Sequence, residues 1–550
     1  MYSAVLPNVA AIDPRLLDME SIDHALHNCA VPCLCAGAVT IVATRDGTLP
    51  SSVRGELERR YGPVAVAATP LSWIDTRVAD LLGARLADRA EMRTNSGESC
   101  RSWSGRRAAF LGLIVIAAIS LAAILAPQTA VIAATLWAVV TLLSVTLLRT
   151  AAAITELHSR RHRKSRPPAD MPTDLPVISV LVPLFREREV ASHLVERLSA
   201  LDYPDDKLDL ILVLEDDDRL TAAAISNADL PSWMRVLPVP CGTIRTKPRA
   251  LNYALDFAIG DIVGVYDAED WPAPDQLRKV AAAFAAAAPD VACVQGVLDF
   301  YNAEKNWLTR CFAIDYATWF GLILPGLARL RMVIPLGGTT LFFRTDVLRK
   351  LGYWDAHNVT EDADLGIRLA RRGYRTEMVT SVTEEEATST VIAWVKQRSR
   401  WIKGYALTWA VHMREPLRTW AELGTWRFIG IQILFLGTLS QFLLAPLLWS
   451  FWLVVFGFWH PFTSAAGPEL IWSVTLLFFA AEILTIGINA LAVTAPKRRW
   501  LIPWVPVMHL YFPLAAIASW KGFYELIRKP FFWDKTRHGR TMLPRRPAPS

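Results

Sequence analysis

Cysteine is scarce in this chain, with seven residues in 550. An odd and scattered set does not form a disulfide framework, and no convincing signal peptide is present, so we expect the folded parts to face a reducing compartment. Cys29, Cys33 and Cys35 lie close together, but the second pair that a zinc site would need is missing. Basic segments interleaved with aromatic residues are also missing, which argues against nucleic acid as a partner.

Charged residues are few and apolar residues are many. Charged types make up 20% of the chain and hydrophobic types 53%, and the mean hydropathy is +0.27. This composition predicts a membrane protein. Several of the 21 tryptophans stand at the ends of apolar runs, as expected at a membrane-water interface. The net charge is +6, and because the basic residues gather beside apolar segments, we expect anionic membrane lipids as partners.

Two regions are predicted to cross the membrane. Residues 109–149 read as a helical hairpin, with uncharged runs at 110–126 and 129–148. Residues 424–520 form a second region, which contains a 32-residue uncharged run at 428–459. That run is either one long tilted helix or a hairpin broken near Pro446. Residues 470–495 span once, and 501–520, rich in proline, form a kinked span or a re-entrant segment.

Glu482 stands inside the 470–495 run, where it marks either a polar path or a hydrogen bond between helices. The basic flank at 149–166 and the basic tail at 521–550 should face the cytoplasm by the positive-inside rule. We therefore expect a multi-pass protein of the bacterial inner membrane, with the parts on either side of the hairpin in the cytoplasm.

Residues 1–108 predict a small cytoplasmic α/β domain. A strand at 38–43 leads through an Asp46-Gly47 turn to a helix at 52–61, and a second strand and helix follow at 62–67 and 74–90. This order resembles the N-terminal domain of type II secretion ATPases, a module also fused to some membrane glycosyltransferases. The Arg-Leu-Gly repeat motif of the members that bind cyclic di-GMP is not seen, which favours a docking domain over a nucleotide sensor.

Residues 170–415 show alternating strands and helices, with strands at 177–183, 208–214 and 261–266. Two of these strands end in carboxylate clusters, one at 215–218 and one at 267–270. Because the carboxyl ends of parallel strands share one edge of a sheet, both clusters should face a ligand there. Acidic helix caps would explain one such cluster, but they explain two plus a third group at 360–362 poorly.

The three clusters suit transfer of a sugar from a nucleotide diphosphate. Asp267 and Glu269 are alternate residues that can both turn to a divalent cation, Mg²⁺ or Mn²⁺. Glu215 or Asp216 can accept hydrogen bonds from a base or ribose, and Lys247 can balance phosphate charge. Asp362 is then available as the general base that deprotonates an acceptor hydroxyl.

Six motifs occur in order, and together they resemble the family 2 glycosyltransferases, in particular the membrane-embedded branch with cellulose, hyaluronan and curdlan synthases. They are Val182 to Glu187, the Glu215 cluster, Lys247 to Asn252, Asp267-Ala268-Glu269, Thr360-Glu361-Asp362 and Gln397-x-x-Arg400-Trp401. The resemblance covers residues 175–405. It implies a GT-A fold, a UDP-sugar donor, a divalent cation, inversion at the anomeric carbon and, in processive members, export of the polymer through the enzyme's own helices.

The resemblance also implies site roles. Donor-binding and acceptor-binding roles pass to the following residues: Glu215, Asp216, Lys247, Asp267, Gln397, Arg400 and Trp401 for the donor, and Gly337, Gly338, Thr339, Glu361 and Trp401 for the acceptor. The sequence departs from the family at two points. Glu269 stands where most relatives have aspartate, which leaves open whether Glu269 or Asp270 reaches the cation. The Glu-Asp-Asp-Asp cluster leaves the uracil contact unassigned.

The predicted architecture is therefore a GT-A α/β domain with a helical transmembrane region and a small N-terminal α/β domain. The favoured function is inverting transfer from a UDP-sugar, UDP-glucose in preference, to a growing β-linked polysaccharide with coupled export and accessory export proteins as candidate partners. One alternative is a single transfer to a lipid or short acceptor. Another is a membrane receptor or secretion component in which the fold is a scaffold, although a scaffold has no need of intact carboxylate clusters.

Overall fold

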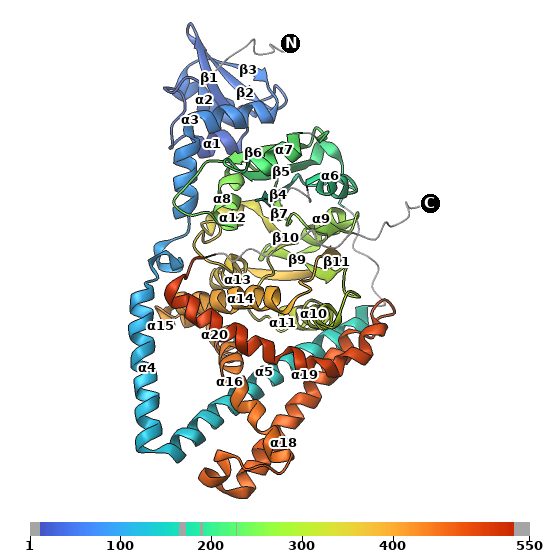
Figure 1. Ribbon diagram of the computed structural model, residues 1–550. Helices are drawn as coiled ribbons and strands as arrows, with labels where there is room; N and C mark the ends of the chain where they lie inside the picture. Colours follow the sequence, from blue (N-terminus) through green and yellow to red (C-terminus); the bar gives the residue numbers. More distant parts are fainter. Residues whose placement is uncertain (1–11, 164–171, 187–190, 227, 533–550) are drawn as a thin grey trace. The chain divides into compact units, whose positions relative to one another are not determined.

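The computed structural model describes residues 12–163, 172–186, 191–226 and 228–532 (Figure 1). Its contacts divide the chain into two compact units. The first contains residues 1–95, 170–286 and 339–357, and the second contains 96–169, 287–338 and 358–550. The predicted catalytic region therefore contributes to both units. The predicted N-terminal domain, 1–108, is divided after residue 95, and the part before that point belongs with the first half of the catalytic region.

The N-terminal module, residues 12–95, is the predicted small α/β fold. Its elements are α1 (Ile22–His27), β1 (Ala30–Ala36), β2 (Val39–Thr44), α2 (Ser51–Tyr61), β3 (Val64–Ala68) and α3 (Leu71–Met92). The strand order is β1-β2-β3, with β1 and β2 antiparallel and β2 and β3 parallel. The parallel β2-α2-β3 crossover confirms the predicted order of elements, whereas α1 and β1 were not predicted.

The rest of the first unit is a five-strand layer with helices. Its strands run in the order β6 (Met234–Val239), β5 (Leu208–Glu215), β4 (Ile178–Leu184), β7 (Ile262–Val265) and β10 (Leu341–Arg344). The first four strands are mutually parallel, and β10 is antiparallel to β7. Every residue of β5 is buried, as expected for a strand covered on both faces, so its apolar run shows no alternation. The helices are α6 (Ala191–Ser199), α7 (Arg219–Ser226), α8 (Lys247–Phe257), α9 (Gln276–Ala286) and α12 (Thr345–Lys350).

Helix α3 packs against α8 and β6 within this unit (Figure 1). Ile74, Val78, Leu82 and Leu86 recur every four residues on its buried face, the spacing of one helical stripe. In α8, all ten residues from Pro248 to Phe257 are buried. The N-terminal module is thus joined to the sheet through a continuous helix-helix core.

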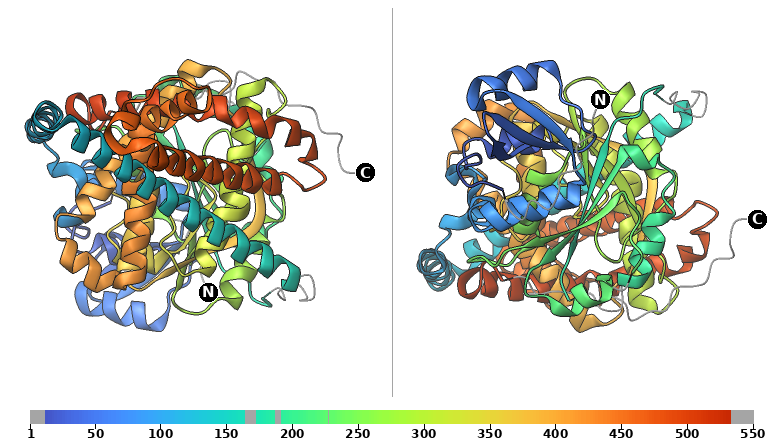
Figure 2. Two further views of the ribbon diagram at one scale, coloured as in Figure 1. Left: turned by 90° about the horizontal axis from the view of Figure 1, so that it is seen from below. Right: turned by 90° about the horizontal axis from the view of Figure 1, so that it is seen from above.

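The second unit contains the parallel strands β9 (Val291–Phe300) and β11 (Arg375–Glu385) and most of the helices. Around these strands lie α10 (Trp307–Thr318), α11 (Leu324–Arg329), α13 (Glu361–Arg371) and α14 (Val391–His412). The helices of the apolar regions are α4 (Gly105–Leu125), α5 (Pro127–Arg163), α15 (Pro416–Ile431), α16 (Thr438–Ser450), α17 (Trp452–Val455), α18 (Pro461–Ala492), α19 (Met508–Tyr511) and α20 (Pro513–Arg528). In Figure 2, α5 in teal lies alongside α18 in orange-red, and the two helices are in contact.

Five helices of the described chain are long and apolar enough to cross a membrane. They are 105–125, 127–162, 307–329, 416–455 and 467–492. The pair 499–511 and 513–528, bent by 43°, would add a sixth as a broken span or a re-entrant segment. The 307–329 helix was not predicted, and 67% of its apolar window is buried inside the protein.

The structure decides between two of the sequence alternatives. Pro446 lies inside α16, so residues 428–455 of this run form a continuous helical segment with a π-helical turn at Gln432–Gly437, and the hairpin broken near Pro446 is wrong. A carboxylate oxygen of Glu482 lies 3.3 Å from Nδ1 of His509, so this side chain makes a polar contact between α18 and α19. Of the basic tail, residues 533–550 lie outside the described part of the chain.

Candidate functional site

Carboxylates follow β5 and β7 at the same edge of the first unit's sheet. β7 ends at Val265, and Asp267 and Glu269 follow as half-buried residues. Asp270 is fully buried. One Asp270 oxygen accepts hydrogen bonds from the Asp267 backbone, at 2.8 Å, and from the Thr339 hydroxyl. Asp270 therefore holds the turn that presents Asp267 and Glu269.

Burial raises the pKa of Asp270 well above its usual value, and the neighbouring carboxylates of Asp267 and Glu269 raise it further. Thr339 was predicted at the acceptor. Its hydroxyl is 2% exposed and is engaged by Asp270 and the carbonyl of Val265, so the structure gives the Thr339 side chain a supporting role in this turn. Of the two candidate cation ligands, Glu269 is the more accessible, and the choice between Glu269 and Asp270 stays a prediction.

Lys247 forms an ion pair with Asp267. It opens α8 after a loop at 240–246, so the helix start sets its direction. In this arrangement the ammonium balances the carboxylate that is predicted to bind a cation. Together with the half-buried Glu269, Asp267 supplies carboxylate oxygen atoms, the hard ligands that Mg²⁺ or Mn²⁺ prefers.

The two candidate base contacts differ in exposure. Glu215 is buried and lies 3.4 Å from Nη1 of Arg249, whereas Asp216 is exposed. Burial raises the pKa of Glu215, and the Arg249 guanidinium opposes that rise. The structure thus makes Asp216 the accessible member of the pair and Glu215 its buried neighbour. The sequence analysis did not predict a role for Arg249 in the site. A basic residue on a mostly apolar helix face could have indicated that this side chain is buried and paired with a carboxylate.

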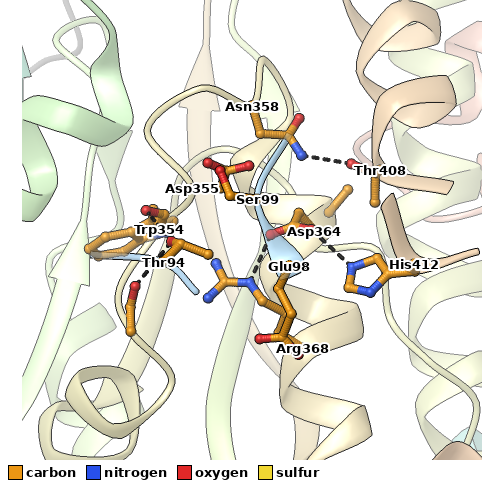
Figure 3. Close-up of polar contacts among 12 residues, drawn as sticks. Thr94, Glu98, Ser99, Trp354, Asp355, Asn358, Asp364, Arg368, Thr408 and His412 are labelled. Carbon is orange, nitrogen blue, oxygen red and sulfur yellow. Dashed lines mark hydrogen bonds and ion pairs between the residues drawn. The ribbon is translucent and has the colours of Figure 1, made fainter. Parts of the chain in front are cut away.

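In the second unit, the carboxylates of the Thr360–Asp364 segment differ in burial and in their partners. Asp364 is fully buried and pairs with Nε of Arg368 at 2.8 Å and with Nε2 of His412 at 2.9 Å (Figure 3). Arg371 donates to Nδ1 of His412 at 3.0 Å, so His412 donates through Nε2 to Asp364. Although burial opposes it, the Arg368 guanidinium holds the pKa of Asp364 below its usual value.

Asp362 remains the accessible carboxylate of this segment. It is half-buried, whereas Glu361 and Asp364 are 4% and 0% exposed. Burial raises the pKa of the Tyr405 phenol, and the nearby Asp362 carboxylate raises it further. Asp362 therefore lies near Tyr405 of α14, the helix that carries the Gln-x-x-Arg-Trp motif. The acceptor role predicted for the buried Glu361 stays a prediction.

Arg398 of helix α14 lies close to three aromatic rings. The Arg398 guanidinium carbon lies 5.0, 5.2 and 4.6 Å from the ring centroids of Phe312, Trp394 and Trp401, and Arg398 also pairs with Asp315. Trp401 is thus held in place by the arginine three residues earlier. Arg398 was not among the predicted site residues, although Trp394 and Trp401 flank it at helical spacing on one face.

The remaining predicted residues of the second unit are half-buried. Gln397 accepts from the Thr388 hydroxyl at 3.5 Å, and the backbone of Gly337 donates to the buried Gln295 at 2.9 Å. Arg400 and Gly338 are also half-buried. The structure therefore places Asp362 at the start of α13, which contacts the α14 helix that carries Gln397 and Trp401. Separately, it places Glu215, Lys247, Asp267 and Glu269 at the sheet edge of the first unit.

A family model described as glycosyl transferase family group 2 matches residues 262–514. Residues 262–514 are therefore similar to family 2 glycosyltransferases. This match begins at β7 and runs through the Thr360–Asp362 segment and α14 into the apolar helices. The glycosyltransferase domain thus includes the strand end at Asp267 and the half-buried Asp362, which confirms the predicted GT-A fold class.

The relatives are named for different activities. A beta-monoglucosyldiacylglycerol synthase from Synechocystis is 29% identical over 47% of this chain and 55% of its own length. A glucomannan 4-beta-mannosyltransferase from rice is 25% identical over 50% of this chain and 54% of its own length. A mannosyltransferase from Pyrobaculum calidifontis, solved with GDP-Man and Mn²⁺, has a TM-score of 0.42 at 21% identity over 70% of this chain and 99% of its own. The chain spans about half the length of the curated relatives it matches.

Proposed function

We propose that the protein moves a hexose, glucose in preference, from a UDP-sugar to a growing β-linked polysaccharide at the bacterial inner membrane, with inversion at the anomeric carbon. The observation that carries this proposal is that neighbouring carboxylates of each cluster differ in exposure. Glu361 and Asp364 are buried, which leaves Asp362 as the accessible base of its segment. Asp267 and Glu269 are accessible in the other cluster, while Asp270 supports them.

In the proposed reaction, the Asp362 carboxylate takes the proton of the acceptor hydroxyl as the oxygen bonds to C1 of the donor sugar. The bond from C1 to the diphosphate oxygen breaks at the same time, and UDP leaves with the electron pair. Asp216 contacts the uracil, and Lys247 faces the diphosphate. Gln397, Arg400 and Trp401 hold the diphosphate and the acceptor sugar, with Trp401 fixed by Arg398.

Asp267 and Glu269 would hold a divalent cation, Mg²⁺ or Mn²⁺, which neutralises charge on the leaving diphosphate when bound. Among the described residues, no group of three or more His, Cys, Asp or Glu side chains is arranged to hold a metal ion. The fit is therefore to a cation that takes further oxygen ligands from the diphosphate, as Mg²⁺ usually does in phosphate-transfer sites. Such a cation would compete with Lys247 for Asp267.

A lipid acceptor is the second candidate, because the Synechocystis relative is named as a glucosyldiacylglycerol synthase. The apolar helices supply a membrane setting for either acceptor. Both candidates keep the same donor site and base and differ only in what is bound beside Trp401. Gly337 and Gly338 would lie along that acceptor.

The test is the size of the product. Membranes that contain the protein are fed UDP-glucose labelled in the sugar, and the products are separated by size and by solubility in organic solvent. Long labelled polymer supports the proposal, and a single labelled sugar on a lipid supports the second candidate. A parent protein that transfers no label from UDP-glucose, UDP-N-acetylglucosamine or GDP-mannose would contradict both and favour a scaffold role.

A further inference from the structure

The loop at 240–246, between β6 and α8, donates hydrogen bonds to a carboxylate of the N-terminal module. Glu91 lies in the last turn of α3 and is 4% exposed. One of its oxygens accepts the backbone N–H of Thr243 at 2.8 Å and that of Ile244 at 3.3 Å. The other accepts the Thr243 hydroxyl. A buried carboxylate with several donors of this kind holds a loop in one conformation.

Arg249 connects Glu91 to the edge of the sheet. Its Nε lies 3.2 Å from Glu91, and its Nη1 lies 3.4 Å from Glu215, the last residue of β5. The Arg249 side chain has no exposed surface, so the two ion pairs are shielded from water and little weakened by salt. A single buried cation therefore links Glu91 to the residue that precedes Asp216.

Gly242 shows how closely the loop covers this pair. A Cβ at position 242 would stand 2.3 Å from Glu91 Oε1 and 2.5 Å from Arg249 Nη2. A side chain there would displace the loop or the Glu91 and Arg249 side chains. The loop is therefore fitted to the Glu91–Arg249 pair at this point.

The same loop leads to the predicted donor residues. Arg245 bonds Asp217 at 2.6 Å, and Lys247, the first residue after the loop, pairs with Asp267. A change in the loop would therefore move groups at both carboxylate clusters of the first unit.

Other ion pairs of the module serve a different part of the interface. Asp75 pairs with Arg235, which also bonds Asp209 at 2.8 Å and the carbonyl of Phe257. Asp75 and Glu91 are almost equally buried, at 5% and 4% exposure. Asp75 thus attaches the module to β5, β6 and the end of α8, whereas Glu91 bonds the loop that carries the donor residues.

We infer that Glu91 is a positioning residue for the nucleotide-sugar site: through Arg249 and the 240–246 loop, the N-terminal module sets the placement of Glu215, Asp216 and Lys247. This inference rests on the proposed function. It makes the module a working part of the donor site, and any partner or ligand that shifts α3 would change donor affinity.

The test compares Glu91→Gln with Asp75→Asn in the full-length chain purified in detergent. The glutamine keeps the size but loses the charge that faces Arg249, and it carries an amide that clashes with the Thr243 or Arg249 donors. UDP affinity is measured by calorimetry, KM and kcat with labelled UDP-glucose, and folding by thermal unfolding. For Glu91→Gln we expect about a tenfold or larger loss of UDP affinity and a similar rise in KM, with kcat changed less, as for supporting residues of ligand sites.

Asp75→Asn should lower the unfolding temperature and leave UDP affinity and KM at the parent values. Gly242→Ala is the second variant, because it disturbs the loop without removing a buried charge, and it should weaken UDP binding in the same direction. Parent-like UDP affinity in folded Glu91→Gln, or an equal loss in Asp75→Asn, would overturn the inference. If the parent binds UDP but transfers no sugar while Glu91→Gln binds UDP more weakly, the proposed function fails and the inference stands.

Discussion

Gly404 of α14 lies directly against Thr360, the residue before α13: a Cβ at position 404 would stand 2.3 Å from the Thr360 hydroxyl oxygen and 2.4 Å from its methyl carbon. This contact sets the spacing between two helices. One carries Gln397 and Trp401, and the other begins at Glu361, next to Asp362. The proposed base and the proposed acceptor platform therefore depend on a glycine that neither motif contains.

Gly404→Ala should lower turnover and stability together. The added methyl has no space, so Thr360 must move and carry Asp362 with it, and overpacking of this kind costs about 1 to 3 kcal/mol. The matched control is Gly487→Ala on α18, where a Cβ meets no atom of the described residues within 4 Å, and turnover should match the parent. Thermal unfolding and labelled-sugar transfer measure the two effects. Parent-like turnover in Gly404→Ala would contradict the role given to this contact.

Asp364→Asn should act on stability. It leaves the buried Arg368 without its carboxylate, and breaking a buried pair in this way costs about 3 to 5 kcal/mol. The pKa of Asp364 is lower in the folded protein than in the unfolded chain, so its contribution to stability is complete above the unfolded value. That contribution is lost as the pH falls below about 4. Unfolding temperatures measured from neutral pH down to acid should converge for parent and Asp364→Asn at the acid end.

The sequence predicts features of the fold that depend on local patterns, and it does not predict features that depend on contacts formed on folding. Strands such as β5 and the carboxylates that end them were readable, because a fully apolar run and its polar end are local patterns. The separate roles of Glu215 and Asp216, or of Asp362 and Asp364, were not readable. Adjacent carboxylates look alike in a sequence, and only the partners that fold around them, Arg249 and His412 among them, distinguish a buried support from an accessible group.

The membrane region shows the same limit. Hydropathy found the apolar runs but not the continuity of 416–455, because proline is tolerated in such helices when the surroundings satisfy the freed backbone groups. The partner of Glu482 was also unreadable, since His509 lies 27 residues away on a segment whose path depends on helix packing.

The membrane orientation is tested by cysteine labelling in intact cells. Positions 160 and 540, in the basic flank and tail, should be protected as Arg160→Cys and Arg540→Cys, because positive segments stay in the cytoplasm. Phe458→Cys, in the connection between α17 and α18, should react with an impermeant reagent, since 416–455 ends there. All three should react after the cells are permeabilised. Labelling of position 160 or 540 from outside intact cells would refute the orientation.

Removal of the metal should stop transfer. Asp267→Asn takes away one of the two accessible carboxylates beside the predicted cation, so it should abolish transfer while the unfolding temperature stays near that of the parent. EDTA should abolish transfer by the parent protein, and added Mg²⁺ or Mn²⁺ should restore it. Glu377→Gln, on a half-exposed part of β11, is a surface carboxylate control and should transfer at the parent rate. Full turnover of the parent in EDTA would contradict the metal-dependent reaction.

Asp362→Asn separates the base from a donor ligand. The amide keeps the size of the side chain and much of its hydrogen bonding but cannot take the acceptor's proton. General-base catalysis typically contributes about 10² to 10⁴-fold, so kcat should fall by that factor while the affinity for UDP stays at the parent value. Unlike Asp364→Asn, it should leave the unfolding temperature nearly unchanged, because Asp362 is half-buried and Asp364 is fully buried. If Asp362→Asn instead weakened UDP binding and kept the parent rate at saturating donor, Asp362 would be a donor ligand, and the base would be another residue.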